Sequence, residues 1–236
     1  MFQLSPELDR AGLARAFAAH GRVQIAGLIA DDGAERLFQQ LGARGDWAQV
    51  INSGDKVFDL ARETRAGMSP AQIQALDDAV FAGARSGFQY RYEAIRVPDG
   101  AAEREASADP LAQFALWLSE GEARDLLREV TGTDAIDFAD AQATAFAPGD
   151  LLTAHDDDVA GKNRHAAYVF GLTPQWRTEW GGLLLFHGAN GDVEHGLLPR
   201  FNTLNLFKIP RLHSVSMVTR AAAYRRYSIT GWLRSA

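Results

Sequence analysis

The chain has 236 residues, of which 47% are hydrophobic, so it can bury a sizeable core. Its net charge of −6 and sequence pI of about 5.5 argue against binding to nucleic acid, which rests on neutralising phosphates with Lys and Arg. The absence of cysteine excludes disulfides, thiolate nucleophiles and Cys-ligated metal sites. The first residues lack a signal-peptide pattern, and the sequence has no apolar run of about 18 residues. We therefore expect a cytoplasmic protein with neither nucleic acid nor a membrane as partner.

The first half of the chain is predicted to be mainly helical. Ser5-Pro6 is typical of a helix start, with Ser5 as the N-cap, and a second Ser-Pro pair occurs at Ser69-Pro70. In chain order, the expected elements are a helix over 5–21, a strand over 23–29, a helix over 31–41, a helix over 69–84, a strand over 87–97, a surface loop over 101–109 and a helix over 110–131.

After about residue 137 the pattern changes to short apolar runs separated by Gly, Pro, Asp and Asn. These runs cover residues 143–146, 151–152, 166–172, 182–186, 203–209, 214–218 and 227–232. Several short strands at such spacing indicate a sandwich or barrel, and a jelly roll is one such fold that can hold a metal. We predict an α+β fold with a mainly β core. It would form a single domain over 1–236, in which 1–136 supply supporting helices and strands and 137–236 the catalytic core.

The triplet His155-Asp156-Asp157 offers two metal ligands at short spacing. On an extended backbone, His155 and Asp157 point to the same side while Asp156 points away, so the first and third residues can chelate one ion. Asp158 has the wrong parity on a strand and is the weaker rival. The alternative interpretation is a solvated acidic turn, because the pattern H-x-D is short and common.

A third ligand must come from elsewhere in the chain. The other histidines are His20, His165, His187, His195 and His213. His213 is favoured because it begins a strand-like run and is followed by a strand that carries Arg226. His187 could end a strand near the site and is the alternative, whereas His20 and His195 are expected at the surface. Two imidazoles and one carboxylate fill one face of an octahedral ion, which is the ligand set of a non-haem Fe(II) oxygenase.

Arg226 and Ser228 alternate on one predicted strand and therefore share one face. Dioxygen activation at such a metal needs an electron donor, and 2-oxoglutarate can supply it if its distal carboxylate is anchored. A guanidinium can bind that carboxylate through two hydrogen bonds, and a neighbouring hydroxyl adds a donor. Arg225 would project to the other face. The alternative interpretation is a pair of surface arginines.

The alternating aromatic residues Phe88, Tyr90 and Tyr92 could line the entrance to a site. Such alternation on one strand face is more often part of a core, and we expect these residues there. The segment from Trp176 to Trp180 is expected to be a loop whose aromatic rings pack on the core.

Four segments, residues 148–157, 172–186, 213–215 and 226–232, together resemble the prolyl-hydroxylase-like branch of the Fe(II)/2-oxoglutarate dioxygenases. The resemblance covers roughly residues 138–234. It implies a double-stranded β-helix with His155, Asp157 and His213 as iron ligands and Arg226, with Ser228, at 2-oxoglutarate. The cofactors implied are Fe(II), 2-oxoglutarate and O2, with ascorbate as a conceivable addition. Related enzymes often have Tyr where this chain has Phe146. Either Ser228 or Thr153 compensates, or 2-oxoglutarate binds more weakly.

The expected function is hydroxylation of a C–H bond coupled to oxidative decarboxylation of 2-oxoglutarate. The resemblance favours a prolyl residue in a protein or peptide as substrate, with free proline or another small molecule as the alternative. Two rivals from other classes are a noncatalytic jelly-roll binding protein and a metal hydrolase. A hydrolase would need a general base beside the metal-bound water and would have no use for Arg226 inside the barrel.

Overall fold

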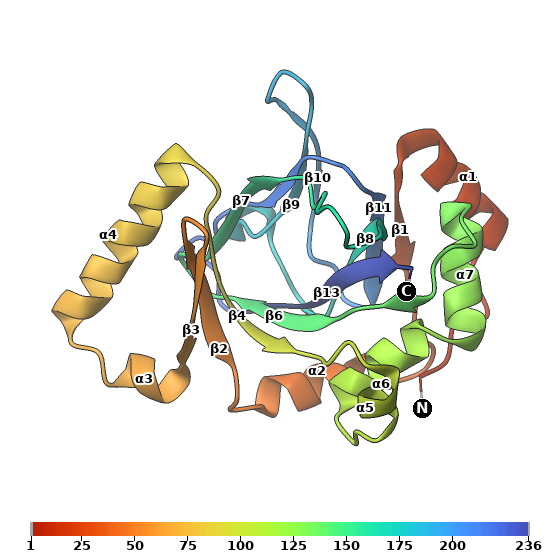
Figure 1. Cartoon of the computed structure of the whole chain (residues 1–236), viewed down its shortest axis with the longest axis horizontal. Coiled ribbons are helices and arrows are strands. Elements are labelled where there is room, and N and C mark those ends of the chain that lie inside the picture. The colour runs from red at the N-terminus through yellow and green to blue at the C-terminus, as the bar shows by residue number, and fades with distance from the viewer. Residues whose placement is uncertain (1, 236) are drawn as a thin grey trace.

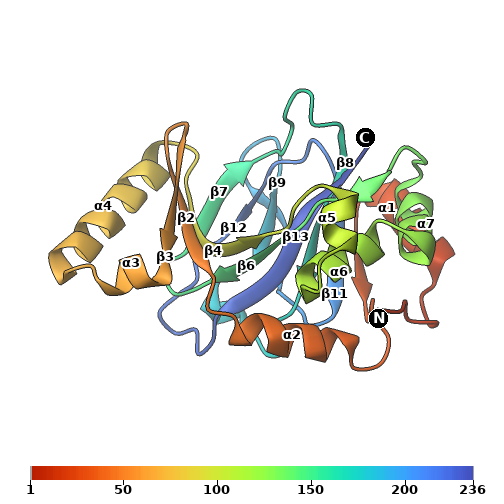
Figure 2. The ribbon, with the colours of Figure 1, turned by 60° about the horizontal axis from the view of Figure 1, so that its bottom comes forward.

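The computed structural model describes residues 2–235. Within that range the strands form one thirteen-stranded antiparallel sheet that curls around a cavity (Figures 1 and 2). Its main path runs β1-β11-β8-β13-β6-β4-β7-β12-β9-β10, while β2 and β3 extend from β4 and β5 pairs with β13. Strands far apart in the chain thus lie side by side, as in a jelly roll. The predicted α+β fold with a β core is confirmed, whereas the single-domain organisation stays a prediction.

The strands are β1 Arg22–Ala26, β2 Ala48–Ser53, β3 Lys56–Ala61, β4 Tyr90–Arg96, β5 Phe138–Ala139, β6 Gln142–Phe146, β7 Leu151–His155, β8 Arg164–Gly171, β9 Leu184–His187, β10 Val193–Leu197, β11 Thr203–Lys208, β12 His213–Val215 and β13 Arg226–Arg234. The helices are α1 Arg10–His20, α2 Gly33–Ala43, α3 Arg62–Ala66, α4 Pro70–Ser86, α5 Ala101–Glu105, α6 Pro110–Leu118 and α7 Gly121–Thr131, with a short 3-10 turn at Thr178–Trp180.

The main hydrophobic core lies between the outer face of the sheet and the helices α1, α2, α6 and α7, which gather on one side in Figure 1. Phe114 of α6 stacks on Phe170 of β8 with ring centroids 5.2 Å apart, and both side chains are fully buried. Burial of such rings stabilises the fold by roughly 1.5–3 kcal/mol each. Because the outer face carries this packing, the inner face is free to present polar side chains to the cavity.

The N-terminal segment differs from its prediction. Ser5 does not cap a helix, because its backbone N–H donates to the carbonyl of Leu28 and Leu4 forms a bridge with Ile29. The first helix begins at Arg10, where the Asp9 carboxylate accepts a hydrogen bond from the Gly12 N–H at 2.9 Å. By contrast, α4 starts as predicted, with a capping box between Ser69 and Gln72.

Three further segments correct the predictions. Residues 101–109 contain the short helix α5 rather than only loop, and the helix predicted over 110–131 is two helices separated at residues 119–120. His195, expected in a loop, lies on β10, which pairs with β9. The hairpin of β2 and β3 had no predicted counterpart; it turns at Gly54, whose φ of 57° suits glycine.

The extended strand predicted over 87–97 is β4, and it occupies a central place. It pairs with β2 on one side and with β6 and β7 on the other, with Ala94 opposite Thr144 and Tyr90 opposite Leu152. The N-terminal half thus supplies part of the cavity wall itself, in addition to supporting helices. None of the helices formed by residues 2–235 has the length and apolar character that a membrane crossing requires.

Candidate metal centre and co-substrate pocket

The inner face of the curled sheet encloses a cavity of about 530 Å³. Its walls come from strands β4, β6, β7, β8, β9, β11, β12 and β13 and from the loop that follows β7. His155, Asp157, His213 and Arg226 all line it. This volume lies within the range usual for small-molecule and cofactor sites.

Two histidines face each other across paired strands at one end of this cavity. His155 ends β7, His213 begins β12, and the two residues are direct partners in the antiparallel register. Nδ1 of His155 donates to the carbonyl of Thr153 at 3.0 Å, and Nδ1 of His213 donates to the carbonyl of Arg211 at 2.7 Å. These bonds fix both tautomers, so each Nε2 presents a lone pair.

Asp157 completes the group. Its Oδ1 lies 3.4 Å from Nε2 of His155, and its Oδ2 lies 3.4 Å from Nε2 of His213. One ligand atom from each of the three residues lies within 4.8 Å of the other two. Two imidazoles and one carboxylate suit a divalent transition metal, and their one-sided arrangement leaves coordination positions toward the cavity.

The electrostatics keep these ligands in the protonation states that a metal needs. Burial lowers the pKa of His213 to about 4, with a further lowering by His155. Burial by itself raises the pKa of Asp157, but the hydrogen bond from His155 and the two nearby imidazoles give a net lowering. At neutral pH the cluster therefore offers a neutral imidazole at His213 and an ionised carboxylate at Asp157.

Asp157 reaches this position by a route different from the one predicted. Strand β7 ends at His155, and Asp157 has a φ of 64°, so the alternation of an extended strand does not describe the segment. Asp158, the rival ligand, is exposed, and its N–H donates to Oδ1 of Asp156.

The other histidines lie away from the cluster. His187 ends β9, next to β12, but its Nε2 contacts the Ser214 hydroxyl at 2.8 Å and it does not line the cavity. His165 contacts Ser235. His195 is exposed on β10, and His20 is exposed in the last turn of α1. The structure therefore brings together His213, and not His187, with His155 and Asp157.

Arg226 lines the cavity from β13, and Ser228 lies beside it on the same face of the strand, as the alternation predicts. Nη1 of Arg226 donates to Oγ of Ser228 at 3.1 Å, and the two hydroxyls of Ser228 and Thr144 lie 2.9 Å apart. All three side chains are buried, with 2% or less exposed. Thr144, on β6 opposite Ser228, had no predicted role; its position two residues before Phe146 could have indicated a shared face.

Arg226 is a buried cation that faces no carboxylate among residues 2–235. Burial lowers its pKa to about 10, which still leaves it charged at neutral pH. Its guanidinium lies 5.2 Å from the ring centroid of Phe146. Its Nε has no hydrogen-bond partner among residues 2–235. Gly182 lies against its side chain, since an added Cβ would come within 3.1 Å of Cδ. An unpaired buried charge is costly, so this arrangement fits an anion.

The neighbouring residue behaves differently. Arg225 projects to the other face and binds Glu93 at 2.6 Å, as the parity argument predicts for a residue outside the pocket. Thr153, considered as a possible replacement for the missing tyrosine hydroxyl, accepts from the Gln89 N–H and donates to the carbonyl of Gly87. The hydroxyls beside Arg226 are those of Ser228 and Thr144 instead.

The three aromatic residues expected in the core line the cavity. Phe88 is half exposed, Tyr90 and Tyr92 are partly buried, and successive ring centroids lie 5.5 and 5.6 Å apart. Tyr92 also stacks on Phe146 at 5.0 Å. The core prediction was wrong for Phe88 and Tyr90, because the inner face of β4 meets the cavity rather than a helix layer, whereas Tyr92 also packs on the small core cluster that contains Phe146. The Trp176–Trp180 loop does pack on a core, as expected.

Arg164 and Trp232 form the wall opposite the aromatic residues of β4, and neither had a predicted role. The guanidinium carbon of Arg164 lies 3.5 Å from the centroid of the Trp232 ring. Its Nη1 donates to the backbone carbonyl of Asp157 at 2.9 Å, while its Nε is buried without a partner among residues 2–235. This pair therefore connects the carboxylate ligand to an aromatic wall of the cavity.

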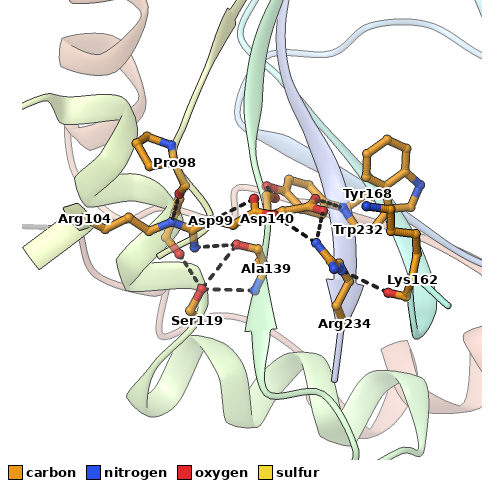
Figure 3. A network of polar contacts seen from close by, with 11 residues as sticks. Pro98, Asp99, Arg104, Ser119, Ala139, Asp140, Lys162, Tyr168, Trp232 and Arg234 are labelled. Carbon is orange, nitrogen blue, oxygen red and sulfur yellow. Dashed lines mark hydrogen bonds and ion pairs between the residues drawn. The ribbon is translucent and has the colours of Figure 1, made fainter. Parts of the chain in front are cut away.

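Behind Trp232, a polar network holds the end of β13 (Figure 3). The Asp140 carboxylate accepts from the Trp232 N–H at 2.6 Å and from Nη1 of Arg234 at 3.3 Å, and the Asp140 carbonyl accepts from the Tyr168 hydroxyl at 2.7 Å. Buried Arg104 donates to the carbonyls of Pro98 and Ala139. These bonds fix the backbone from which Trp232 projects into the cavity.

Comparisons with known proteins agree with this geometry. Residues 141–234 match the family model described as the 2OG-Fe(II) oxygenase superfamily. A search of curated protein sequences gives no match. Among solved structures, a prolyl-4-hydroxylase from Pseudomonas putida is 19% identical, with a TM-score of 0.62 over 96% of this chain and 99% of that chain.

Two more distant structures share the fold. A prolyl hydroxylase in complex with a hypoxia inducible factor oxygen degradation domain peptide fragment from Trichoplax adhaerens is 15% identical, with a TM-score of 0.62 over 96% of this chain and 89% of that one. A 2OG-Fe(II) oxygenase family oxidoreductase from Burkholderia pseudomallei is 14% identical, with a TM-score of 0.59 over 98% and 92%.

The family match covers most strands of the cavity, including those that carry the His-Asp-His cluster and Arg226. The structural neighbours show the prolyl-4-hydroxylase-like form of the fold. Over residues 141–234 the chain matches the 2OG-Fe(II) oxygenase superfamily, and this match indicates a dioxygenase that uses Fe(II), 2-oxoglutarate and O2.

Proposed function

We propose that His155, Asp157 and His213 hold the iron, that Arg226 with Ser228 and Thr144 binds 2-oxoglutarate, and that the enzyme hydroxylates a prolyl residue of a protein or peptide. The observation that carries the co-substrate assignment is the burial of Arg226 in the same cavity as the His-Asp-His cluster, with no carboxylate partner among residues 2–235. A dicarboxylate that reaches from the metal to Arg226 supplies that partner. The cytoplasmic location expected from the sequence belongs to the same proposal.

The chain's own residues have separate tasks in this reaction. The carbonyls of Thr153 and Arg211 hold the two imidazoles in the tautomer that binds metal. The guanidinium of Arg226 and the Ser228 and Thr144 hydroxyls orient the distal carboxylate of 2-oxoglutarate. Iron, when bound, supplies the redox chemistry of dioxygen. One oxygen atom enters the new hydroxyl group and the other enters succinate, while 2-oxoglutarate loses CO2.

Two features support a prolyl substrate. The solved neighbours include a prolyl-4-hydroxylase and a prolyl hydroxylase with a bound peptide fragment. In this chain, the Trp232 indole offers a flat apolar surface to the cavity, and Arg164 beside it carries a buried Nε without a partner among the described residues. An apolar ring could pack on the indole while the guanidinium donates to an adjoining peptide carbonyl. Free proline or another small molecule is the alternative substrate.

The first test concerns cofactors and excludes the hydrolase and the noncatalytic rival. Anaerobic addition of Fe(II) and 2-oxoglutarate should produce a weak visible metal-to-ligand charge-transfer band. The Asp157→Ala variant should not give the band. The Arg226→Ala variant should give it only at a much higher concentration of 2-oxoglutarate. Arg225→Ala is the matched control and should behave as wild type. A wild-type protein without the band, or equal effects of the two arginine variants, would contradict the assignment.

The second test concerns the substrate. Decarboxylation of 2-oxoglutarate would be measured with free L-proline, short proline peptides and longer proline peptides. If remote contacts supply binding energy, stimulation should rise from proline to the longer peptides. Stimulation by free proline alone would contradict a peptide substrate while leaving the cofactor assignments intact.

A further inference from the structure

The cavity contains one cation that the proposed function does not use. Three arginines line it, and Arg226 and Arg164 already have tasks at the co-substrate and at the Asp157–Trp232 wall. The third, Arg96, is the last residue of β4. Its exposed side chain has no ion-pair or hydrogen-bond partner in the part of the chain that the structure describes.

Arg96 stands in a row of polar side chains that crosses three strands. Gln142 of β6 is its direct partner in the register, and Thr230 of β13 is the partner of Gln142. All three line the cavity. Tyr90 and Tyr92 share their side of β4 with Arg96, and its charge acts on both phenols. The Gln142 side chain acts on the Tyr92 hydroxyl and opposes the rise of its pKa that burial causes. Guanidinium, amide and hydroxyl donors thus converge on one part of the wall.

The acidic residues of the cavity lie at the other end of β4. Asp156 and Asp158 follow His155, whose ring centroid is 5.5 Å from that of Phe88, just before β4 begins. Arg96 is eight positions further along the chain than Phe88, which corresponds to roughly 25 Å of extended backbone. The cavity is therefore polarised, with aspartates beside the metal ligands and an unpaired arginine at the far end of this strand.

We infer that Arg96, with Gln142 and Thr230, binds a carboxylate group of the substrate and so selects an anionic substrate. This inference rests on the proposed function, because it assumes that Arg226 is occupied by the co-substrate. A planar guanidinium flanked by an amide and a hydroxyl matches the geometry of a carboxylate. The carboxylate belongs either to a small acid or to the C-terminus or an acidic side chain of a peptide.

The test uses pairs of probes that differ only in charge. N-acetyl-L-proline, a C-terminal prolyl tripeptide and a tripeptide with glutamate beside proline would each be compared with the corresponding amide. Binding would be measured by isothermal titration calorimetry to the anaerobic protein loaded with Fe(II) and 2-oxoglutarate. The loss of one charge-assisted contact predicts that the carboxylate binds roughly ten- to a hundredfold more tightly than its amide in at least one pair. The pair that shows the difference identifies the source of the carboxylate.

Variants then locate the effect. Arg96→Ala should remove the preference for the carboxylate, and Arg96→Lys should restore part of it. Arg15→Ala, which changes an exposed arginine of α1 outside the cavity, should keep the full preference. Equal binding within every pair, including no binding at all, would overturn the inference. So would equal losses in the Arg96 and Arg15 variants.

The charge-transfer band separates this inference from the proposed function. A normal band in wild type and in Arg96→Ala, together with loss of the carboxylate preference in the variant, supports both. A normal band without any preference overturns only the role of Arg96. Absence of the band overturns the proposed function, and the same titrations on metal-free protein then decide whether Arg96 alone gives the preference.

Discussion

Two adjacent residues at the start of β13, Arg225 just before the strand and Arg226 as its first residue, show how the outer and inner faces of the sheet treat charge. On the outer face, Arg225 joins Arg62 and Arg65 around the carboxylate of Glu93, which is 1% exposed. On the inner face, Arg226 is just as deeply buried as Glu93 and has no acidic partner among residues 2–235. Charges that stabilise the fold are paired within the protein, whereas a charge that serves a ligand is left for that ligand. Changes on the inner face should therefore affect function first, and changes on the outer face should affect stability first.

The largest functional effect is expected from the inner face at Asp157. Asp157→Ala, like His155→Ala or His213→Ala, should abolish turnover because each removes one of three proposed ligands. Iron content after anaerobic loading and the rate of succinate release would be measured together. His187→Ala is the matched control, since His187 contacts Ser214 outside the cluster. Full activity in His213→Ala with loss in His187→Ala would show that the third ligand is wrong.

The largest effect on stability is expected from the outer face at Glu93. Burial opposes ionisation of this carboxylate, but the hydrogen bond from Arg62 and the charges of Arg225 and Arg62 give a net lowering of its pKa. Glu93→Ala leaves three arginines without their shared acceptor and should lower the free energy of unfolding by about 3–5 kcal/mol. Urea unfolding measures this, with Glu63→Ala as an exposed control. The affinity of the surviving folded protein for 2-oxoglutarate should stay within about threefold.

Arg226→Met tests the other half of the comparison. Loss of a charge-assisted contact to a buried carboxylate should weaken 2-oxoglutarate binding by about a hundredfold. Without ligands, however, replacing an unpaired buried cation by an apolar side chain of similar length should leave the free energy of unfolding unchanged or raise it. Titration of the charge-transfer band and urea unfolding give the two quantities. A marked destabilisation of the ligand-free protein would contradict the division between the two faces.

His213 lies on the inner face, yet its pKa should make the stability of the protein depend on pH. It therefore sharpens the comparison between the inner and outer faces. Its folded pKa of about 4 lies below the ordinary histidine value of 6.5, so the unfolded chain takes up a proton first as the pH falls. The contribution of His213 to the stability of the metal-free protein should be complete above pH 6.5 and should fall by roughly 1 kcal/mol per pH unit toward pH 4, in the opposite sense to the contribution of Asp150, whose pKa burial raises to about 6. Urea unfolding at several pH values would show this slope. His213→Gln should flatten it, whereas the exposed control His20→Gln should not.

The smallest effects are expected at Asp140, which connects the two faces. Asp140→Ala removes the acceptor of the Trp232 N–H and of Arg234, and should cost about 1–3 kcal/mol of stability. Because Trp232 lines the cavity, the KM for substrate should also rise a few fold while the Fe(II) and 2-oxoglutarate band stays normal. The exposed control is Asp134→Ala. A loss of stability with unchanged KM would confine Asp140 to a structural role.

Local alternation could be predicted from the sequence where strands are regular. Arg226 and Ser228 share a face because β13 is extended from Arg226 onward, and Arg225, the residue before the strand, projects to the other face. The same rule gave the wrong reason for Asp157, which lies beyond the end of β7 with a positive φ. Periodicity describes side-chain direction only within an element, so it fails where the element ends.

Long-range arrangement could not be predicted in the same way. Phe88, Tyr90 and Tyr92 have the pattern of a core strand, and only the pairing of β4 with β6 and β7 decides that they line a cavity. The positions of Thr144 beside Ser228 and of Arg96 beside Gln142 likewise become apparent only when the pairing of the strands is known. Ser5-Pro6 has the composition of a helix start, but pairing of this segment with residues 28–30 prevails over local propensity.

The pairing of β1 with β11 also bears on how the chain is made. Arg22 lies opposite Phe207, and Ala26 opposite Thr203, so an edge of the sheet formed by the first strand stays open until residue 208 has left the ribosome. Strand β4 can pair with β2 early, but its pairing with β6 and β7 must wait until residues 142–155 are synthesised. Such pairings between distant segments slow folding and leave nascent strands exposed. Newly made protein should therefore depend on chaperones that shield unpaired strands, and expression at lower temperature should raise the yield of folded enzyme.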